Sequence, residues 1–365
     1  MKLLDSIFDT AFRFLPHRSK TGLFPIGDPD RSSPVIVTGN YTLTVRRVSK
    51  ALQGEDVWLL VTDSRGINVW CAAGGGHLTH HDVIAAVRTS QVADRVDHQE
   101  LILPQLSATG VERNRVEEAT GWHATWGPVH ATDLPAFLRR GRHAVREERA
   151  VRFPMSDRLQ MAVMWTAPMV PILWLILWAI SGPLPAVVGA VAITAIVLGL
   201  FAGMPWLPLR THRGLLVYGG LALAGFAFGA ALFTAAGALT TRNLIVLAAA
   251  CVVGTGIVSV DVAGSTPLLS SSVNPSDFRV ELLVDRCTGA AQCVLVCPRD
   301  VLVMNGHVHK VEIVRPANCI LCGACIVQCP EDALRFRFDD GRVVEPATIR
   351  RTRLNLLGKR TIDVT

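Results

Sequence analysis

The feature that most constrains this chain of 365 residues is a set of seven cysteines between residues 287 and 329. Four of them follow the spacing C-x2-C-x2-C-x3-C-P: Cys319, Cys322, Cys325 and Cys329, before Pro330. In bacterial-type ferredoxins the first three cysteines of such a run hold one iron–sulfur cluster and the fourth reaches a second cluster. Zinc is the alternative, but it takes four ligands and would leave three cysteines unexplained. Because thiolate ligands must stay reduced, we expect this region to face a reducing compartment.

An incomplete copy of the same motif precedes the complete one, with Ala290 at its second position. Crossed ligation then divides the cysteines into two sets. The complete set is Cys297, Cys319, Cys322 and Cys325, and the incomplete set is Cys287, Cys293 and Cys329. We predict an α+β two-cluster ferredoxin domain in which the complete set holds a 4Fe–4S cluster. Three thiolates favour a 3Fe–4S cluster at the incomplete set, and a 4Fe–4S cluster with a labile fourth site is the alternative.

A central block of the chain is predicted to cross a membrane. Half of all residues are hydrophobic, and many of these lie in four segments of about 20 mostly apolar residues, the length that spans a bilayer as a helix. Arginines crowd before the first segment and between the second and third, whereas the other loops hold only Arg242. The positive-inside rule predicts a multi-pass protein of the cell inner (cytoplasmic) membrane with both termini in the cytoplasm. The four segments are residues 160–181, 184–203, 215–237 and 244–260.

Anchoring is the expected role of these segments. Their clearest ionisable residue is Asp261, at the very end of the fourth, whereas an ion or proton pathway needs buried charges. We expect Cys251, in the middle of that segment, to be a packing residue. The net charge of +6 comes largely from arginines beside these segments. We therefore predict that the membrane, and not a nucleic acid, is the partner of the basic residues.

Composition and charge divide the chain into six segments. The first predicts a short helix on the protein or membrane surface, because its apolar residues recur at helical spacing and the charges among them exclude a signal peptide. The last is a basic tail that rests either on anionic lipid or on the first folded domain. In chain order, the segments are an N-terminal segment (1–33), a first folded domain (34–150), a transmembrane domain of four helices (158–262), a Ser-rich linker (263–277), the ferredoxin domain (278–342) and the tail (343–365).

The first folded domain alternates strand-like and helix-like runs, which favours an α/β, Rossmann-like fold with a parallel sheet. It contains neither a G-x-G-x-x-G fingerprint nor a P-loop, and the glycines at 74–76 lack the Lys-Ser/Thr that a P-loop requires. The predicted strands cover 57–61 and 101–103, and the predicted helices cover 83–87, 116–119 and 132–140.

Cys71 stands far from the other cysteines, where a strand is expected to end. Such a cysteine is a nucleophile, a metal ligand or a packing residue, and the residues alone do not choose among these. The alanines and glycines that follow would let the backbone lie close against a flat ligand. The nearby His77, His80 and His81 are expected to be solvated residues at the start of a helix.

The residues around Cys71 carry a resemblance to a known family. The run Asn68-Val69-Trp70-Cys71-Ala72-Ala73-Gly74 resembles the signature of the corrinoid protein of microbial mercury methylation. That family is itself similar to the corrinoid iron–sulfur protein of the acetyl-CoA pathway. This chain resembles a fused form that also carries the ferredoxin partner. The likeness extends to residues 38–41, 101–105, 127–129, 133–137 and 354–360.

The resemblance implies a corrinoid-dependent methyltransferase. The seven residues from Asn68 to Gly74 would bind a cobalamin-type corrinoid, with the Cys71 thiolate as the lower axial ligand of cobalt. The ferredoxin domain would reduce the cobalt with electrons from an external donor. The methyl group would come from a methyl-donor protein or a methyl-tetrahydrofolate-dependent methyltransferase and pass to Hg(II) or another thiophilic acceptor. A D-x-H-x-x-G signature, the mark of histidine ligation, is absent from the sequence.

Two other functions remain open. The chain could be a membrane-tethered iron–sulfur electron-transfer protein without corrinoid, or a corrinoid-binding module without turnover. Two positions depart from the mercury-methylation family: Gly75 stands where its motif usually has lysine, and the tail lacks the cysteines of its ferredoxin. Cobalt content separates the electron carrier from the other two functions, and methyl transfer separates the remaining pair.

Overall fold

The computed structural model describes residues 13, 15–209, 213–264, 278–355 and 360–361. The chain divides into two compact units. The helical unit holds the described residues from Arg152 to Gly264, and the large unit joins Pro16–Val151 to the described residues from Phe278 onward. We call the two parts of the large unit the N-terminal lobe and the C-terminal lobe. The helix expected near the N-terminus and nearly all of the expected linker lie outside the described residues.

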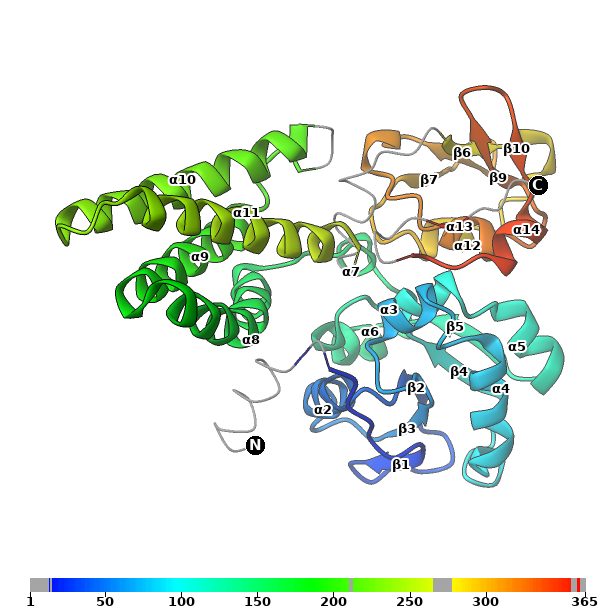
Figure 1. Ribbon diagram of the computed structural model, residues 1–365. Helices are drawn as coiled ribbons and strands as arrows, with labels where there is room; N and C mark the ends of the chain where they lie inside the picture. Colours follow the sequence, from blue (N-terminus) through cyan, green and yellow to red (C-terminus); the bar gives the residue numbers. More distant parts are fainter. Residues whose placement is uncertain (1–12, 14, 210–212, 265–277, 356–359, 362–365) are drawn as a thin grey trace. The chain divides into compact units, whose positions relative to one another are not determined.

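The N-terminal lobe is built on a five-stranded sheet with strand order β1-β3-β2-β4-β5 (Figure 1). Strands β2, β3, β4 and β5 pair in parallel, and β1 adds an antiparallel edge. The chain runs from β2 outward to β3 and then back across to β4, which makes the carboxyl end of β2 the switch point of the sheet. The expected α/β domain with a parallel sheet is confirmed. The strands are β1 (Gly22–Ile26), β2 (Val35–Gly39), β3 (Val57–Thr62), β4 (Glu100–Leu103) and β5 (His123–Trp126).

Helices cover both faces of this sheet. Along β2, Val35 and Val37 point into one apolar core while Ile36 points into the other, as the alternation of a strand requires. The first core is closed by α4 (His80–Thr89) and α5 (Arg113–Thr120), and the second by α2 (Thr42–Ala51) and α6 (Leu134–Arg139). The short α7 (Arg146–Arg149) ends the lobe.

Two boundaries of this lobe differ from the sequence-based prediction. The sheet begins at β1, before residue 34, so the predicted domain of residues 34–150 lacks its edge strand. This strand contains Pro25, which weakens a strand pattern but is tolerated at a sheet edge. The helix expected from residue 132 begins at Leu134, because Ala131–Asp133 form the 3-10 turn η3.

The C-terminal lobe has the α+β architecture expected of a ferredoxin domain. Its antiparallel sheet has the order β10-β9-β6, and β7 and β8 form a separate hairpin. The prediction that the domain ends at residue 342 and a separate tail follows is wrong in part, because β10 and α14 belong to this lobe. Its elements are β6 (Phe278–Leu282), α12 (Gln292–Leu295), β7 (Leu302–Asn305), β8 (Lys310–Ile313), α13 (Ala324–Val327), β9 (Leu334–Phe338), β10 (Val343–Val344) and α14 (Pro346–Arg351).

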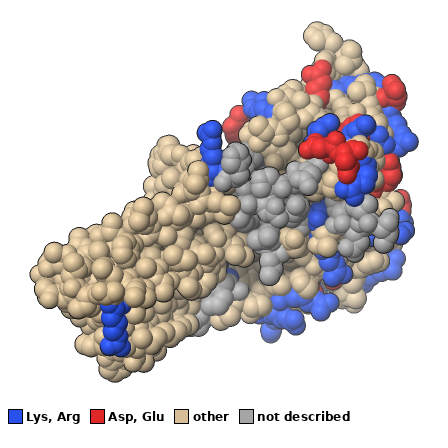
Figure 2. Space-filling view, turned by 45° about the horizontal axis from the view of Figure 1, so that its top comes forward, with Lys and Arg blue, Asp and Glu red and all other residues tan. Residues whose placement is uncertain are grey.

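The helical unit consists of four helices long and apolar enough to cross a membrane, as the sequence predicts. On the face shown in Figure 2 this unit is almost devoid of charged side chains, whereas the large unit carries many. Small residues bring the helices together: a Cβ on Gly225 would lie 2.3 Å from Ile196, and one on Gly254 would lie 2.5 Å from Ile193. The helices are α8 (Met155–Ser181), α9 (Pro183–Gly203), α10 (Arg213–Ala235) and α11 (Thr241–Gly264).

Asp261, the ionisable residue singled out in the fourth segment, has a partner within the helical unit. The Trp165 indole Nε1 donates a hydrogen bond of 2.8 Å to its carboxylate. Cys251 is buried among apolar residues of the same unit, as expected for a packing residue.

Candidate metal centre

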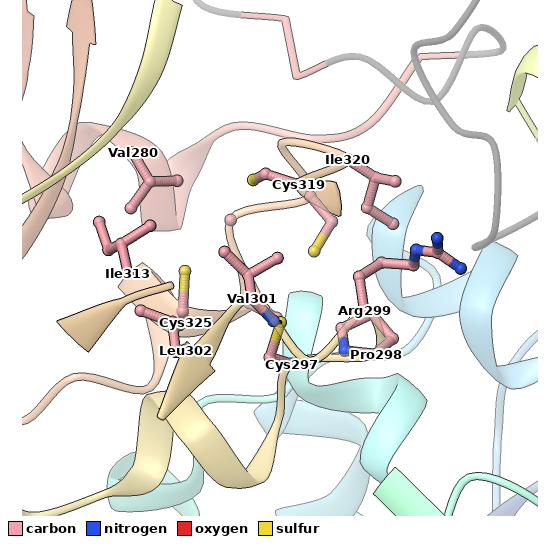
Figure 3. A pocket seen from close by; sticks show the side chains of 13 residues that line it. Val280, Cys297, Pro298, Arg299, Val301, Leu302, Ile313, Cys319, Ile320 and Cys325 are labelled. Atoms are coloured by element: carbon pink, nitrogen blue, oxygen red, sulfur yellow. Dashed lines mark hydrogen bonds between the residues drawn. The ribbon is translucent and has the colours of Figure 1, made fainter. Parts of the chain in front are cut away.

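The complete set of cysteines lines a pocket in the C-terminal lobe. Figure 3 shows Cys297, Cys319 and Cys325 on its wall beside apolar side chains such as Val301 and Ile320. Burial, together with the neighbouring Cys297 and Cys319, raises the pKa of the Cys322 thiol to about 12. Four thiolates would repel one another in this apolar setting unless a cationic core held them together. The pocket therefore fits a cubane cluster.

The incomplete set lies at the other cluster position of the same lobe. Burial raises the pKa of Cys293 to about 12, and Cys329 and Cys287 lie close enough to raise it as well. The incomplete and the complete motif, which we call the first and second half-repeats, each end in a cysteine that accepts a backbone hydrogen bond. The Val301 amide donates to Cys297 Sγ and the Ala333 amide to Cys329 Sγ, each at 3.3 Å. The four cysteines of the complete set line one pocket, and Cys329 and Cys287 lie near Cys293, while no three candidate ligands among the described residues converge closely enough to hold a single metal ion. The division into two ligand sets stays a prediction.

Cys71 lies on a short helix, α3 (Val69–Gly74), and not at the strand end that the sequence suggested. Asn68 caps this helix, since its side-chain oxygen accepts a hydrogen bond of 3.0 Å from the Cys71 amide. Asn68 is exposed and Cys71 is half-buried, whereas the other five residues of the predicted corrinoid-binding run are buried. They hold the helix in place, and Cys71 is the one residue of α3 that is not buried.

The small residues after Cys71 pack against the protein itself. A Cβ on Gly74 would lie 2.7 Å from the Leu354 side chain, and one on Gly110 would lie 2.3 Å from the Ala73 carbonyl oxygen. The expectation that this run presses against a flat ligand is therefore only part of the explanation. Close packing on the C-terminal segment and on the loop after β4 also requires small residues here.

Asn40, directly after β2, fastens the loop that leads to α3. Its side-chain oxygen accepts hydrogen bonds from the amides of Ser64 (2.9 Å) and Gly66 (3.0 Å), and its nitrogen donates to Asp63 (3.0 Å). Asn40 is 3% exposed, so this network is shielded from water. The carboxyl end of β2 thereby fixes where Cys71 stands.

Three buried polar atoms lie at the carboxyl ends of neighbouring parallel strands. Thr38 Oγ1 on β2, Gln105 Oε1 after β4 and Trp126 Nε1 at the end of β5 have no hydrogen-bond partner among the described residues. Unpaired buried polar atoms are uncommon in native proteins and call for a partner such as a ligand or water. Ligands of doubly wound folds bind outside this edge of the sheet. The row fits a large ligand with polar side groups, as a corrinoid has.

The two lobes meet close to both metal-ligating elements. Gln328, just before Cys329, donates to the carbonyl oxygens of Ala108 (2.8 Å) and Val111 (2.7 Å) and accepts from the Arg113 amide (3.2 Å). Ala108 belongs to the 3-10 helix η2 (Gln105–Thr109), which leads into the Gly110 that packs on α3.

The same interface has an apolar part. Val296, at the position equivalent to Gln328 in the first half-repeat, is buried in one core with Trp70 and Ala73 of α3. Cys322 of the complete set is buried in that core too. The complete set is therefore tied through packed side chains to the helix that carries Cys71.

The C-terminal segment also reaches α3. The Leu354 amide donates a hydrogen bond of 2.8 Å to the Gly74 carbonyl oxygen, at the end of the helix. The tail was expected to rest either on anionic lipid or on the first folded domain, and the structure shows that Leu354 contacts the first folded domain. The motifs did not identify Gln328, Leu354 or Arg360 as site residues, because each acts across the lobe interface rather than through a local pattern.

The histidines near Cys71 lie in different settings. His77 and His81 are exposed. His80 Nδ1 lies 3.5 Å from Glu112 Oε1, and burial lowers the pKa of His80 although Glu112 opposes that shift. His80 is thus less solvated than expected of a residue at the start of a helix.

Two family models match the chain. The model described as the CO dehydrogenase/acetyl-CoA synthase delta subunit matches residues 8–138, and the model of a 4Fe-4S dicluster domain matches residues 286–333. The first match covers most of the N-terminal lobe, and the second contains both cysteine sets.

Curated relatives resemble the first of these segments. The gamma subunit of the acetyl-CoA decarbonylase/synthase complex of Methanopyrus kandleri is 38% identical over 127 residues, which are 34% of this chain and 27% of that subunit. The corrinoid/iron-sulfur protein large subunit of Moorella thermoacetica is 29% identical over 127 residues, 34% of this chain and 28% of that subunit. The chain spans only about a quarter of the length of these relatives. The chain thus joins a segment similar to these proteins to four apolar helices and to a segment that matches the 4Fe-4S dicluster model.

Proposed function

We propose that this protein is a membrane-anchored corrinoid methyltransferase whose own ferredoxin domain reduces the corrinoid. The observation that carries the proposal is the single core that α3 shares with the C-terminal lobe. Trp70 and Ala73, on either side of Cys71, pack in the same cluster of buried residues as Cys322. A ferredoxin lobe that packs directly against the helix that carries Cys71 is suited to pass single electrons to a cofactor bound at that helix.

The residues of the chain divide the work. Cys71 would ligate the cobalt as a thiolate, and the capped helix α3 holds the residue in place. The two cysteine sets would hold the clusters, and the packed lobe interface keeps them beside α3. The corrinoid, when bound, supplies the chemistry of accepting and handing on a methyl group. A strongly donating thiolate favours transfer of the methyl group as a carbanion equivalent.

The methyl acceptor proposed for the protein is Hg(II) or another thiophilic species. The Cys71 run, which resembles that of the mercury-methylation corrinoid protein, supports this proposal, and so does the polarity that a thiolate ligand gives to the methyl group. The methyl group would come from a methyl-donor protein or a methyl-tetrahydrofolate-dependent methyltransferase, and the electrons from an external donor. Both departures from the family lie beside the residues that would hold the corrinoid: the Gly75 amide donates a hydrogen bond of 2.9 Å to the Cys71 carbonyl oxygen, and the tail, which lacks the cysteines of the family's ferredoxin, contacts Gly74 through Leu354.

The helical unit is proposed to anchor the protein in the cytoplasmic membrane. All four helices meet the length and hydropathy needed to cross a bilayer. The distribution of arginines supports the proposal that both termini, and with them both lobes of the large unit, lie on the cytoplasmic side. That side is also the reducing one, as the cysteine sets require.

Metal content tests the proposal. Protein purified without oxygen and supplied with corrinoid should contain about one cobalt per chain and both iron–sulfur clusters. Cys71→Ala should lose most of the cobalt-bound corrinoid, seen as cobalt and as the visible spectrum, while its iron stays unchanged. The matched control is Cys251→Ala, because Cys251 is the other cysteine outside the cluster sets and lies buried in the helical unit.

The competing function is a membrane-tethered electron carrier. It is favoured by the match of residues 286–333 to a dicluster ferredoxin, which by itself needs no corrinoid. Iron without cobalt in the wild-type protein would establish the carrier and contradict the methyltransferase. Cobalt retained in Cys71→Ala would contradict the assignment of Cys71 as its ligand.

A further inference from the structure

Arg360 is a charged side chain buried between the two lobes. It is 3% exposed, and its guanidinium donates to carbonyl oxygens on three segments. Nε donates to Cys322 (2.8 Å), one terminal nitrogen donates to Ile349 (3.0 Å) and Thr352 (2.8 Å), and the other donates to Thr109 (2.9 Å). One residue thus joins the cysteine loop of the complete set, the C-terminal segment and the η2 loop of the N-terminal lobe.

No carboxylate forms an ion pair with Arg360 among the residues that the structure describes. Burial lowers its pKa to about 10, which leaves it charged at neutral pH. The charges that act on it are those of Cys322 and Cys325, two ligands of the complete set. A buried cation without a carboxylate partner is costly by itself, so its anionic counterpart is expected close by.

The local backbone is shaped to admit this side chain. Gly323, between the two cysteines, has a φ of +74°, and a Cβ on it would lie 2.5 Å from Arg360 Nε. Arg360 also pairs with Leu354 in a short antiparallel bridge, and Leu354 in turn binds the end of α3. The guanidinium is therefore fixed against the cysteine loop and cannot move into solvent without breaking this packing.

We propose that Arg360 is a positioning residue that raises the reduction potential of the cluster held by the complete set. This inference rests on the proposed function, since it requires that cluster. When the cluster takes up one electron from an external one-electron donor, its negative charge increases by one and no bond is formed or broken. A fixed cation in a low-dielectric interior stabilises the more negative state.

The consequence is a direction for electron flow. The guanidinium of Arg360 donates to the Cys322 carbonyl oxygen of the complete set, and among the described residues no hydrogen bond joins it to a cysteine of the incomplete set. The cluster of the complete set would therefore hold electrons more tightly than it would without the cation. Relative to a protein without the cation, this favours transfer of an electron from the incomplete-set cluster to the cluster packed against α3.

Redox titration of the anaerobically purified full-length protein, followed by electron paramagnetic resonance, tests the inference. Arg360→Gln removes the charge and keeps a donor. The equilibrium constant for reducing the complete-set cluster is expected to fall about tenfold, which is about 59 mV for one electron. Arg360→Lys should keep most of the wild-type value. Arg351→Gln removes an exposed charge from the same segment and should leave the potential unchanged.

The outcomes separate this inference from the proposed function. A wild-type protein without a cluster at the complete set would contradict the proposed function itself. Clusters present in Arg360→Gln with both potentials unchanged, or shifted equally, would overturn the role of Arg360. If Arg360→Gln takes up no cluster, Thr352→Asp and Thr352→Asn decide, because Thr352 Oγ1 lies 3.2 Å from the guanidinium. A lower complete-set potential in the aspartate variant alone supports the inference, and equal potentials overturn it.

Discussion

Replacing Gln328 with methionine is expected to loosen the C-terminal lobe from the η2 loop, with a loss of about 3 kcal/mol in the free energy of unfolding. Methionine has a similar length and fills the same space, but it removes all three hydrogen bonds that Gln328 makes across the interface. The carbonyl oxygens of Ala108 and Val111 and the Arg113 amide would then be buried without partners, at roughly 1–3 kcal/mol for each unsatisfied group before relaxation.

Hydrogen exchange measures this loss where it occurs. Amides of residues 105–113 should exchange about a hundredfold faster in Gln328→Met, which corresponds to about 2.7 kcal/mol. Amides of the sheet in the N-terminal lobe should change less. Gln53→Met is the matched control, because Gln53 is exposed in the same lobe. Unchanged exchange at residues 105–113 would mean that Gln328 does not hold the lobes together.

The same variant has a functional readout. If the lobe interface keeps the clusters beside α3, single-turnover reduction of bound corrinoid should slow in Gln328→Met while iron and cobalt content stay at wild-type levels. Normal metal content with a normal rate would show that electron transfer does not depend on this contact. Loss of iron would instead show that Gln328 is needed to form the neighbouring cluster.

The features that the sequence predicts well are those encoded over short distances. The four long apolar helices follow from runs of apolar residues, and the ferredoxin domain that holds seven cysteines follows from the spacing of a repeated motif. The parallel sheet follows from alternating strands and helices. In each case the pattern lies within one or two elements, so a linear reading contains most of the information.

What the sequence did not predict depends on contacts between distant residues. Arg360 and Thr109 are 251 positions apart, and no local pattern links them. The sequence predicts a basic tail on anionic lipid or on the first folded domain, but it does not indicate that Arg360 is buried where backbone carbonyl oxygens replace water. The sequence indicates that the alanines and glycines after Cys71 permit a close approach. The fold shows that Leu354 and Gly110 are the residues that approach them.

The change from Ala290 to cysteine is expected to complete the incomplete set. In the complete motif, the backbone on either side of Cys322 has positive φ, at Leu321 (+55°) and Gly323 (+74°). The first half-repeat has the same pattern around Ala290, at Gly289 (+82°) and Ala291 (+57°). The loop therefore keeps the conformation of a ligand-bearing loop and lacks only the sulfur. A cysteine side chain built on this backbone would project as Cys322 does.

Iron analysis and electron paramagnetic resonance check this expectation. Iron should rise from about seven to about eight atoms per chain if the wild-type protein holds a 3Fe–4S cluster. The paramagnetic signal of an oxidised 3Fe–4S cluster should disappear, because an oxidised 4Fe–4S cluster is diamagnetic. If the wild-type cluster is 4Fe–4S with a labile site, mild oxidation should remove one iron from the wild type and none from Ala290→Cys.

The control for this variant is Thr288→Cys, which adds a thiol on the same exposed loop but outside the motif spacing. It should leave iron content and the oxidised spectrum unchanged, because spacing and backbone conformation, rather than the mere presence of a nearby thiol, determine which cysteine can reach the cluster. Equal iron content and equal oxidised spectra in the two variants would contradict the inference that the loop around Ala290 has the conformation of a ligand-bearing loop. An Ala290→Cys protein with the wild-type spectrum would instead mean that Ala290 does not occupy the place of the missing ligand.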